Sequence, residues 1–424
     1  MANNPEPAAE PEEAPKSFIA LRHPAARMYL IGAALAMMAD NIEHVISYWI
    51  LYEKFQSPML QGFAIFSHWV PFLLFSFWAG GLADRFDPRK LIQIGMVLFM
   101  LVSLGWGVLF WLDIMEEWHA VVLLSVHGFA GVLWSPAAQL FIHSVVGGKQ
   151  LQSAIRTMAS SRTLGILFGP AVGGGMMIAF GPTVGILLNV LFYLPLAIWL
   201  FYAPKKEESE EAPRRRGLGS FTEVKQTIRD LTGNHIVLSM TLLAGVTSMI
   251  VGNAFQGQMP KFALDFGHKD GTVLYSMLLA ANAAGALTAG IVLESGGFLQ
   301  ARVKTAFVLA GLWCLSLGGF ALAGNYWIAL FLLMAAGFLN LAFSSMARTL
   351  AQLNSPPEVR GRAIGLFNVS DLGLRSISGV IMGGGGVMIG IHSTLALTCV
   401  ILLIVIAAIF VRMPNARATP GAAE

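Results

Sequence analysis

Long apolar runs are the feature that most constrains this chain. Twelve segments of the 424-residue sequence are mainly apolar over about 20 residues, the length at which a helix crosses the hydrocarbon core of a bilayer. Only 12% of the residues are charged, against about a quarter in a soluble domain. The predicted fold class is therefore an all-α integral membrane protein with twelve transmembrane helices. The runs are, approximately, residues 28–51, 59–82, 91–112, 119–143, 160–180, 183–202, 235–257, 272–294, 303–323, 326–349, 362–388 and 391–411.

The basic residues between these runs predict the orientation of the chain. Of the 27 Lys and Arg residues, only Lys54, Lys261 and Lys269 fall in loops on one side of the predicted membrane. By the positive-inside rule, this asymmetry places both termini in the cytoplasm. The predicted division is residues 1–25, a disordered N-terminus; 26–202, a first group of six helices; 203–234, a charged linker with a short amphipathic helix near Phe221 to Leu231; 235–412, a second group of six; and 413–424, a cytoplasmic tail.

The two groups of helices carry a weak internal repeat. At a constant offset of 209 residues, Gly81 aligns with Gly290, and HGFAGVLWS (127–135) aligns with AGFLNLAFS (336–344). Each match is weak alone, but several matches on one ungapped offset indicate a duplicated unit. The sequence therefore predicts two pseudo-symmetric six-helix bundles, as in transporters built from parallel repeats.

The loop GGLADRFDPRKL (80–91), between the second and third runs, resembles the signature loop of the major facilitator superfamily, G-x-x-x-D-R-x-G-R-R/K. The matching residues are Gly80, Asp84, Arg85, Arg89 and Lys90, whereas Asp87 and Pro88 replace a glycine and a basic residue. The resemblance implies that the loop holds the two halves together at the cytoplasmic side, with Asp84 facing the start of the eleventh helix. The alternative is a plain basic loop that serves only orientation.

The fifth run contains a second motif, RTLGILFGPAVGGG (162–175). Gly165, Gly169 and Gly173 recur every four residues and leave one helix face bare, so that a partner helix can approach closely. Pro170 is expected to kink the helix. With Gly174, the stretch resembles the GxxxGPxxGG motif of proton-coupled drug exporters in the same superfamily. The alternative is generic packing of small residues.

Ionisable residues inside the apolar runs are the candidate functional residues, because charge is costly within a bilayer. Asp40, Glu43 and His44 form a stripe with Ser47 on one face of the first helix. Asp371 and Arg375 lie one helical turn apart. Three interpretations stay open for them: a structural ion pair, an anion-binding site, or part of the machinery that couples an ion to transport. These five ionisable residues are the candidates for proton coupling or substrate binding. In the superfamily, helices 1, 4, 7 and 10 line a central cavity. The polar residues of these helices that are candidates for lining it are His127, Asn253, Gln256 and Asn340. A structural ion pair between Asp40 and His44 is the alternative for the first helix. His68 and His127 are interpreted first as hydrogen-bonded interior residues, with a role as ligands as the alternative.

Together these features resemble the drug and siderophore exporter branch of the superfamily. The implied function is proton-coupled efflux of a small amphiphilic molecule by alternating access, with a proton or another cation as coupling ion, in a monomer of the bacterial inner membrane. Open alternatives are a nutrient uptake symporter, a lysophospholipid flippase and a non-transporting membrane scaffold. No phosphate-binding loop occurs in the sequence, so ATP is not indicated as an energy source. The lack of HExxH and GxSxG argues against a membrane protease or hydrolase, and the chain is not expected to be an enzyme. No cofactor, metal site or nucleic-acid partner is expected.

Overall fold

The computed structural model describes residues 19–204, 225–226, 228–229, 231, 233–267, 271–296, 302–356 and 359–412. The expected N-terminal segment, most of the linker with its amphipathic helix, and the C-terminal tail lie outside these residues. The N-terminal half contains η1 (Ile19–Arg22), α1 (Pro24–Phe55), α2 (Pro58–Arg85), α3 (Pro88–Trp111) and α4 (Glu117–Tyr202). Backbone breaks at Gly147 and Gly181, with φ of 68° and 78°, divide α4 into three consecutive helices.

The C-terminal half has shorter helical pieces, because two of its spans are irregular. The pieces are α6 (His235–Ile250), α7 (Ala254–Gly257), α8 (Met259–Asp265), α9 (Gly271–Gly296), α10 (Val303–Ala321), α11 (Tyr326–Leu353), α12 (Arg360–Asn368), the π-helix η2 (Val369–Gly373), α13 (Arg375–Ile389) and α14 (Ile391–Arg412).

The prediction of an all-helical membrane protein is confirmed. Ten stretches of the described residues are long and apolar enough to cross a membrane. One of them, Ser153–Tyr202, contains the two helices that meet at Gly181. The first helix, α1, is 32 residues long but is not among the ten. Its polar stripe around Asp40 and Glu43 lowers its mean hydropathy.

The seventh span differs from the prediction of one continuous helix over 235–257. The helix α6 ends at Ile250, and Gly252 adopts a φ of 50°, in the left-handed region that favours glycine. The Gly252 N–H donates to the carbonyl of Thr247 at 2.9 Å, which closes the end of α6. A side chain at Gly252 would also lie 2.6 Å from the hydroxyl oxygen of Ser378. The chain therefore bends where it passes close to α13.

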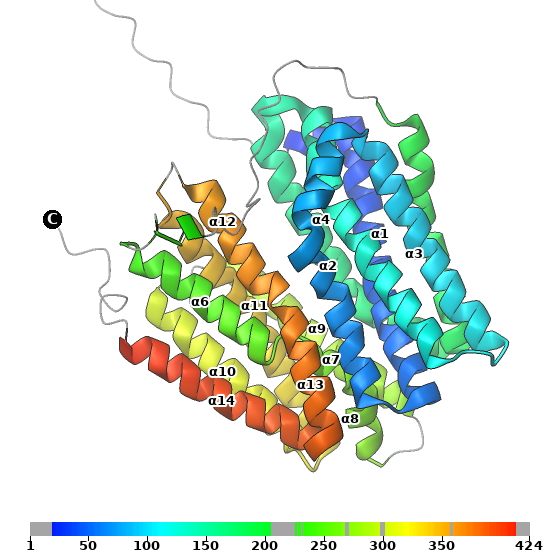
Figure 1. Cartoon of the computed structure of the whole chain (residues 1–424), viewed down its shortest axis with the longest axis vertical. Helices are drawn as coiled ribbons and strands as arrows, with labels where there is room; N and C mark the ends of the chain where they lie inside the picture. The colour runs from blue at the N-terminus through cyan, green and yellow to red at the C-terminus, as the bar shows by residue number, and fades with distance from the viewer. Residues whose placement is uncertain are drawn as a thin grey trace, which may run out of the picture.

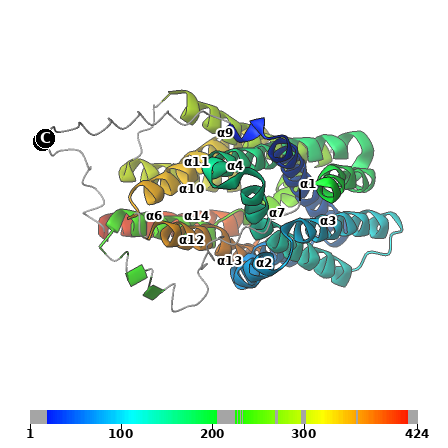
Figure 2. The same ribbon diagram turned by 90° about the horizontal axis from the view of Figure 1, so that it is seen from above.

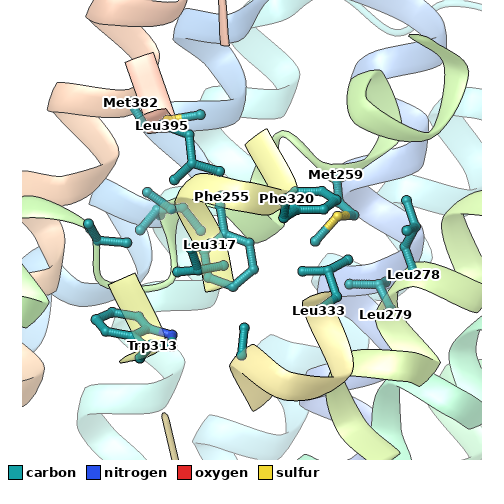
Figure 3. Close-up of a cluster of buried hydrophobic side chains, with 14 of the residues drawn as sticks. Phe255, Met259, Leu278, Leu279, Trp313, Leu317, Phe320, Leu333, Met382 and Leu395 are labelled. Atoms are coloured by element: carbon teal, nitrogen blue, oxygen red, sulfur yellow. The ribbon is translucent and has the colours of Figure 1, made fainter. Parts of the chain in front are cut away.

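The helices pack as two bundles, one from each half of the chain (Figure 1). The core of the C-terminal bundle lies where the helices α7 to α11, α13 and α14 converge (Figure 3). Trp313 of α10 and Phe255 of α7 are both almost completely buried in it. The core residues labelled in the figure are Phe255, Met259, Leu278, Leu279, Trp313, Leu317, Phe320, Leu333, Met382 and Leu395.

The two bundles meet toward the end of the molecule that carries the α1–α2 turn, which is here called the far side. The opposite end, where α4 ends and α6 begins, is the linker side. Across the contact, α2 lies beside α13 and α4 lies beside α9 (Figure 2). Tyr275 of α9 donates its hydroxyl to the carbonyl of Val45 at 2.8 Å, and Gln258 donates its amide to the carbonyl of Pro58 at 2.8 Å. On the linker side the bundles splay apart (Figure 1).

Candidate functional site: a carboxylate–histidine cluster inside the N-terminal bundle

Five ionisable side chains from three helices meet inside the N-terminal bundle. Asp40, Glu43 and His44 come from α1, His68 from α2 and His127 from the first part of α4. The helix α1 positions its three residues on one face because they are three and four residues apart. The predicted stripe on α1 therefore points at two histidines from other helices, which the fold brings to it. This group of five is called the carboxylate–histidine cluster below.

His127 lies between the two carboxylates. Its Nδ1 atom is 2.7 Å from Oε1 of Glu43, and its Nε2 atom is 3.0 Å from Oδ1 of Asp40. Glu43 is 2% exposed and His127 4% exposed, so both groups are withdrawn from solvent. The Nε2 atom of His127 is buried, and despite its short distance to Asp40 it makes no hydrogen bond of acceptable geometry. The Nδ1 edge of the imidazole is thus fixed by Glu43, whereas the Nε2 edge points toward Asp40 without a well-directed hydrogen bond.

Glu43 is held by polar residues of two neighbouring spans. Ser103 of α3 donates its hydroxyl to Oε2 of Glu43 at 2.5 Å. Asn189, in the last part of α4, donates its amide to the Ser103 hydroxyl oxygen at 3.2 Å and to the carbonyl of Ala39 at 2.9 Å. Both side chains are fully buried. They support the position of Glu43 and its bond to His127.

Ser103 and Asn189 are not among the predicted site residues, because the candidates are ionisable residues of the apolar runs and amides of the helices expected to line the cavity. The signal was nevertheless present. Asn189 is an amide within a long apolar run, and a buried amide in a membrane has to find hydrogen-bond partners within the protein.

The other side of the cluster consists of His44 and His68. His44 Nδ1 lies 3.7 Å from Oδ2 of Asp40, and His44 Nε2 lies 3.2 Å from Nδ1 of His68. The His44 ring also lies edge-on to the His127 ring, with centroids 4.8 Å apart. The three imidazoles and the Asp40 carboxylate therefore converge on one small volume. The predicted contact between Asp40 and His44 is present, as one part of a larger network.

Asp371 and Arg375 form a second polar group, in the C-terminal bundle. Asp371 sits in the π-helix η2 and accepts a hydrogen bond from Ser248 at 3.1 Å. Arg375 Nη2 lies 3.2 Å from Oδ1 of Asp371, and Arg348 Nη2 lies 3.7 Å from Oδ2. The predicted pair is formed, with Arg348 as a third member that the sequence did not single out. Single π-helical turns such as η2, in which one extra residue is inserted into a helix, are frequent at functional sites.

Trp69 connects the two polar groups across the contact between the bundles. The guanidinium of Arg375 lies over the Trp69 ring, 5.1 Å from its centroid. The same ring packs edge-on to His68, with centroids 4.6 Å apart. A movement of α13 relative to α2 would therefore change the surroundings of His68.

The predicted cavity-lining amides lie apart from the carboxylate–histidine cluster. Asn253 is half-buried at the break between α6 and α7, where its Oδ1 atom is buried without a hydrogen-bond partner. Gln256 of α7 and Asn340 of α11 are also half-buried. Two cavities, of about 270 and 530 Å³, lie on the far side beside Tyr52 and Gln56.

The predicted gate loop is ordered by bonds within the N-terminal bundle. Asp87 caps α3 by accepting from the N–H of Arg89 at 3.0 Å and also pairs with the Arg89 guanidinium at 2.5 Å. Arg89 Nη1 donates to the carbonyl of Ala203 at 2.8 Å. The hydrogen bonds from Arg89 hold the pKa of Asp87 below its usual value. The departure from the superfamily pattern at Asp87 thus creates a helix cap. Gly80 lies in the last turns of α2, Arg85 and Lys90 are exposed, and the side chain of Asp84 lies outside the described ones.

The glycines of the fifth span allow close contact with α1. A side chain at Gly165 would lie 2.7 Å from the carbonyl oxygen of Ala34, and one at Gly169 would lie 2.4 Å from Cβ of Asn41. Gly173 faces Ile42 and Val45 of the same helix, whereas Gly174 faces Ser276 of α9 in the other bundle. Pro170 lies inside the helix, and the non-helical residues of α4 are at Gly147 and Gly181 instead.

Comparison with known proteins places these features in a family. Residues 29–373 match the family model for the Major Facilitator Superfamily. The chain is 26% identical to the uncharacterized MFS-type transporter YfiS of Bacillus subtilis, covering 82% of this chain and 83% of that protein. It is 22% identical to the macrolide efflux protein A of Streptococcus pyogenes, covering 79% and 82%. It is 25% identical to the enterobactin exporter EntS of Salmonella typhi, covering 73% of each.

The fold is also that of solved transporters. A bacterial homologue of the human lysosomal transporter Spinster, in an inward-facing and unoccupied conformation, superposes with a TM-score of 0.67 at 13% identity. The match covers 94% of this chain and 98% of that one. At this identity the likeness concerns the fold alone.

Proposed function

Because this chain belongs to the Major Facilitator Superfamily, we propose that it is a secondary transporter that couples proton movement to the efflux of a small amphiphilic molecule. The observation that carries the proposal is the carboxylate–histidine cluster, in which His127 lies between Asp40 and Glu43 near the middle of the membrane-spanning helices. Two carboxylates in a low-dielectric interior need compensating positive charge, and protons are the simplest source of it.

The arrangement offers a route for a proton within the cluster. Asp40 is 8% exposed and Glu43 is 2% exposed, so Asp40 is the better-placed group for exchange with water. His127 connects the two carboxylates through its two ring nitrogens, and an imidazole can accept a proton at one nitrogen while it releases one from the other. We therefore assign Asp40 as the entry group and Glu43 as the inner partner that fixes His127.

In alternating access, the carboxylate–histidine cluster is exposed to one side of the membrane and then to the other. We place the linker side in the cytoplasm of a bacterial inner membrane, because the basic loops lie on that side. The structure then corresponds to an inward-facing state, since the bundles contact one another toward the far side and splay apart on the linker side (Figure 1). Release of substrate outward requires that contacts such as Tyr275 to Val45 and Gln258 to Pro58 break.

The direction and substrate class of the proposal rest on the relatives and on the aromatic residues. Two relatives named for efflux, of a macrolide and of enterobactin, each align over more than 70% of the chain. Trp69 stands between the two polar groups, with Arg375 over its ring. An aromatic face next to a guanidinium suits a molecule that has both apolar and anionic parts.

A susceptibility assay tests this proposal. The chain is expressed in a bacterial strain that lacks its own exporters, and growth is measured with a panel of macrolides, cationic amphiphiles and catecholate siderophores. We expect protection against at least one class with the wild type and its loss with Asp40→Asn. His392→Gln, which alters a histidine–aspartate pair on the far side, is the matched control and should protect as the wild type does. Equal protection by wild type and Asp40→Asn would contradict the proposed role of Asp40.

A further inference from the structure

The carboxylate–histidine cluster contains more nitrogen donors than a proton pathway needs. Asp40, His44, His68 and His127 each offer one ligand atom, and the four atoms lie within 4.8 Å of one another. Three imidazoles and one carboxylate are a donor set typical of zinc and its neighbours in the first transition row. We propose that these four side chains bind one divalent transition-metal ion. This proposal goes beyond the proposed function, because binding of the ion requires neither a substrate nor a proton gradient.

The distances between the donor atoms fit a four-coordinate ion. In a tetrahedral zinc site with metal–nitrogen distances of about 2.0–2.1 Å, neighbouring ligand atoms lie about 3.3 Å apart. Nε2 of His127 and Oδ1 of Asp40 are 3.0 Å apart, and Nε2 of His44 and Nδ1 of His68 are 3.2 Å apart. These two pairs already have the spacing of tetrahedral edges. One ligand atom from each of the four residues lies within 4.8 Å of the others, so within that set no pair exceeds the tetrahedral spacing by more than about 1.5 Å, which small side-chain rotations can close.

The surroundings of His127 resemble the outer shell of a metal site. A histidine that binds a metal through one nitrogen usually gives its other nitrogen to a carboxylate, which fixes the tautomer and the ring. Here Nδ1 of His127 is bound to Glu43 at 2.7 Å, and Glu43 is fixed in turn by Ser103. Nε2 is left facing the other donors, buried and without a hydrogen-bond partner. Leaving a buried polar atom unsatisfied is costly, and a metal ion at this point would satisfy it.

Charge balance favours an ion of charge two. Asp40 and Glu43, when ionised, bring two negative charges into the bundle, and a neutral imidazole adds none. One divalent cation therefore leaves the group neutral, which the membrane interior strongly favours. Arg375 lies on the other side of the Trp69 ring, where its ion-pair partner is Asp371. Mg²⁺ and Ca²⁺ are disfavoured because they prefer an all-oxygen shell.

Cobalt is a suitable probe, because tetrahedral Co²⁺ has intense visible absorption bands that octahedral Co²⁺ in water lacks. Purified full-length protein, with any affinity tag removed, is titrated with Co²⁺ in detergent. We expect one Co²⁺ per chain with tetrahedral bands, bleached by Zn²⁺ and unaffected by Mg²⁺. His44→Gln and His68→Gln should each weaken binding at least about tenfold, and Glu43→Gln, which changes only the outer shell, about 10–100-fold.

His392→Gln is the matched control, because His392 also pairs with an aspartate, Asp265, but on the far side of the molecule. It should bind Co²⁺ as the wild type does. Size-exclusion profiles and unfolding temperatures identify any variant that fails to fold, and the remaining variants still decide the question. Absence of tetrahedral bands in the folded wild type would overturn the proposal. Binding that persists unchanged in both His44→Gln and His68→Gln would also overturn it, because the ion would then be adventitious.

Discussion

The imidazole of His127 is shared between two carboxylates, with Nδ1 2.7 Å from Oε1 of Glu43 and Nε2 3.0 Å from Oδ1 of Asp40. The two acids belong to the same helix, and the histidine comes from α4, which reaches them through the packing of α1 against α4. This relationship places two carboxylates and one imidazole in direct contact inside the N-terminal bundle.

Replacing Ser103 by Ala should destabilise the N-terminal bundle. The change removes the 2.5 Å hydrogen bond to Glu43 and leaves a buried carboxylate oxygen without that donor. The expected loss is about 1–3 kcal/mol, visible as a lower unfolding temperature in detergent. Ser125→Ala is the control, because among the described residues the Ser125 hydroxyl bonds within its own helix, to the carbonyl of Val121. Equal unfolding temperatures for Ser103→Ala and wild type would show that Glu43 does not depend on this donor.

A methyl group at Gly169 should disturb the contact between α4 and α1. The new Cβ would lie 2.4 Å from Cβ of Asn41, so one of the helices has to shift. Overpacking of this kind costs about 1–3 kcal/mol, and the shift would also move the α1 face that carries Asp40. Gly175→Ala is the control within the same helix, since none of the described atoms beyond the neighbouring backbone of its own helix lies within 4 Å of the added Cβ. Unfolding temperature and efflux are measured for both variants, and the same values for both would refute the steric argument.

Tyr275→Phe should weaken the closure of the far side. The change removes the 2.8 Å hydrogen bond to Val45 but keeps a ring that stacks on Trp49. Ser276, which packs against Gly174 across the same contact, can be changed to cysteine as a reporter. In a Cys314→Ser, Cys399→Ser background, a membrane-impermeant thiol reagent added outside should label this cysteine faster in Tyr275→Phe. An unchanged or slower rate would mean that this bond does not hold the bundles closed.

The pairing of Asp87 with Arg89 predicts a pH-dependent contribution to stability. The pKa of Asp87 is lowered in the folded chain, chiefly by the hydrogen bond from the Arg89 side chain. A carboxylate whose folded-state pKa is depressed stabilises the fold above its unfolded value of about 3.9, and this contribution disappears as the pH falls through the folded pKa. Because the pair is partly exposed, Asp87→Asn should cost only about 0.2–1 kcal/mol at neutral pH.

The check is the unfolding temperature of wild type and Asp87→Asn from pH 7 into the acid range, where the difference between the two curves should shrink as the pH falls below about 3.9. Arg85→Gln, an exposed change in the same loop, should show a constant offset instead. A difference in unfolding temperature between wild type and Asp87→Asn that stays constant across the pH range would contradict the predicted pH-dependent contribution of Asp87.

The fold was predictable from the sequence because the membrane imposes strong rules on it. A run of about 20 apolar residues has few outcomes in a bilayer other than a helix. The breaks were less predictable. Gly252 is one of 45 glycines in this chain, and its positive φ and its close approach to Ser378 are features of the tertiary fold that hydropathy does not record. The π-turn around Asp371 likewise depends on packing that hydropathy does not record.

The site was predictable only in part. The spacing of Asp40, Glu43 and His44 places them on one face of α1 whatever the fold around them. That His68 and His127 face the same point depends on how α2 and α4 rotate about their axes, which a single sequence does not specify. In the sequence, Ser103 and Asn189 are ordinary polar residues, and their role is visible only in the structure, where Ser103 bonds to Glu43 and Asn189 bonds to Ser103. Each of these contacts joins residues far apart in the chain.

The most direct test of the account is substrate flux in proteoliposomes under an imposed pH gradient. The substrate is whichever compound the susceptibility assay identifies, and wild type is compared with Asp40→Asn, Glu43→Gln and the control His392→Gln. The account predicts that wild type and His392→Gln concentrate the substrate against its gradient, whereas Asp40→Asn and Glu43→Gln only allow it to equilibrate. If both acid variants concentrate the substrate as well as wild type does, the carboxylate–histidine cluster does not couple transport to protons.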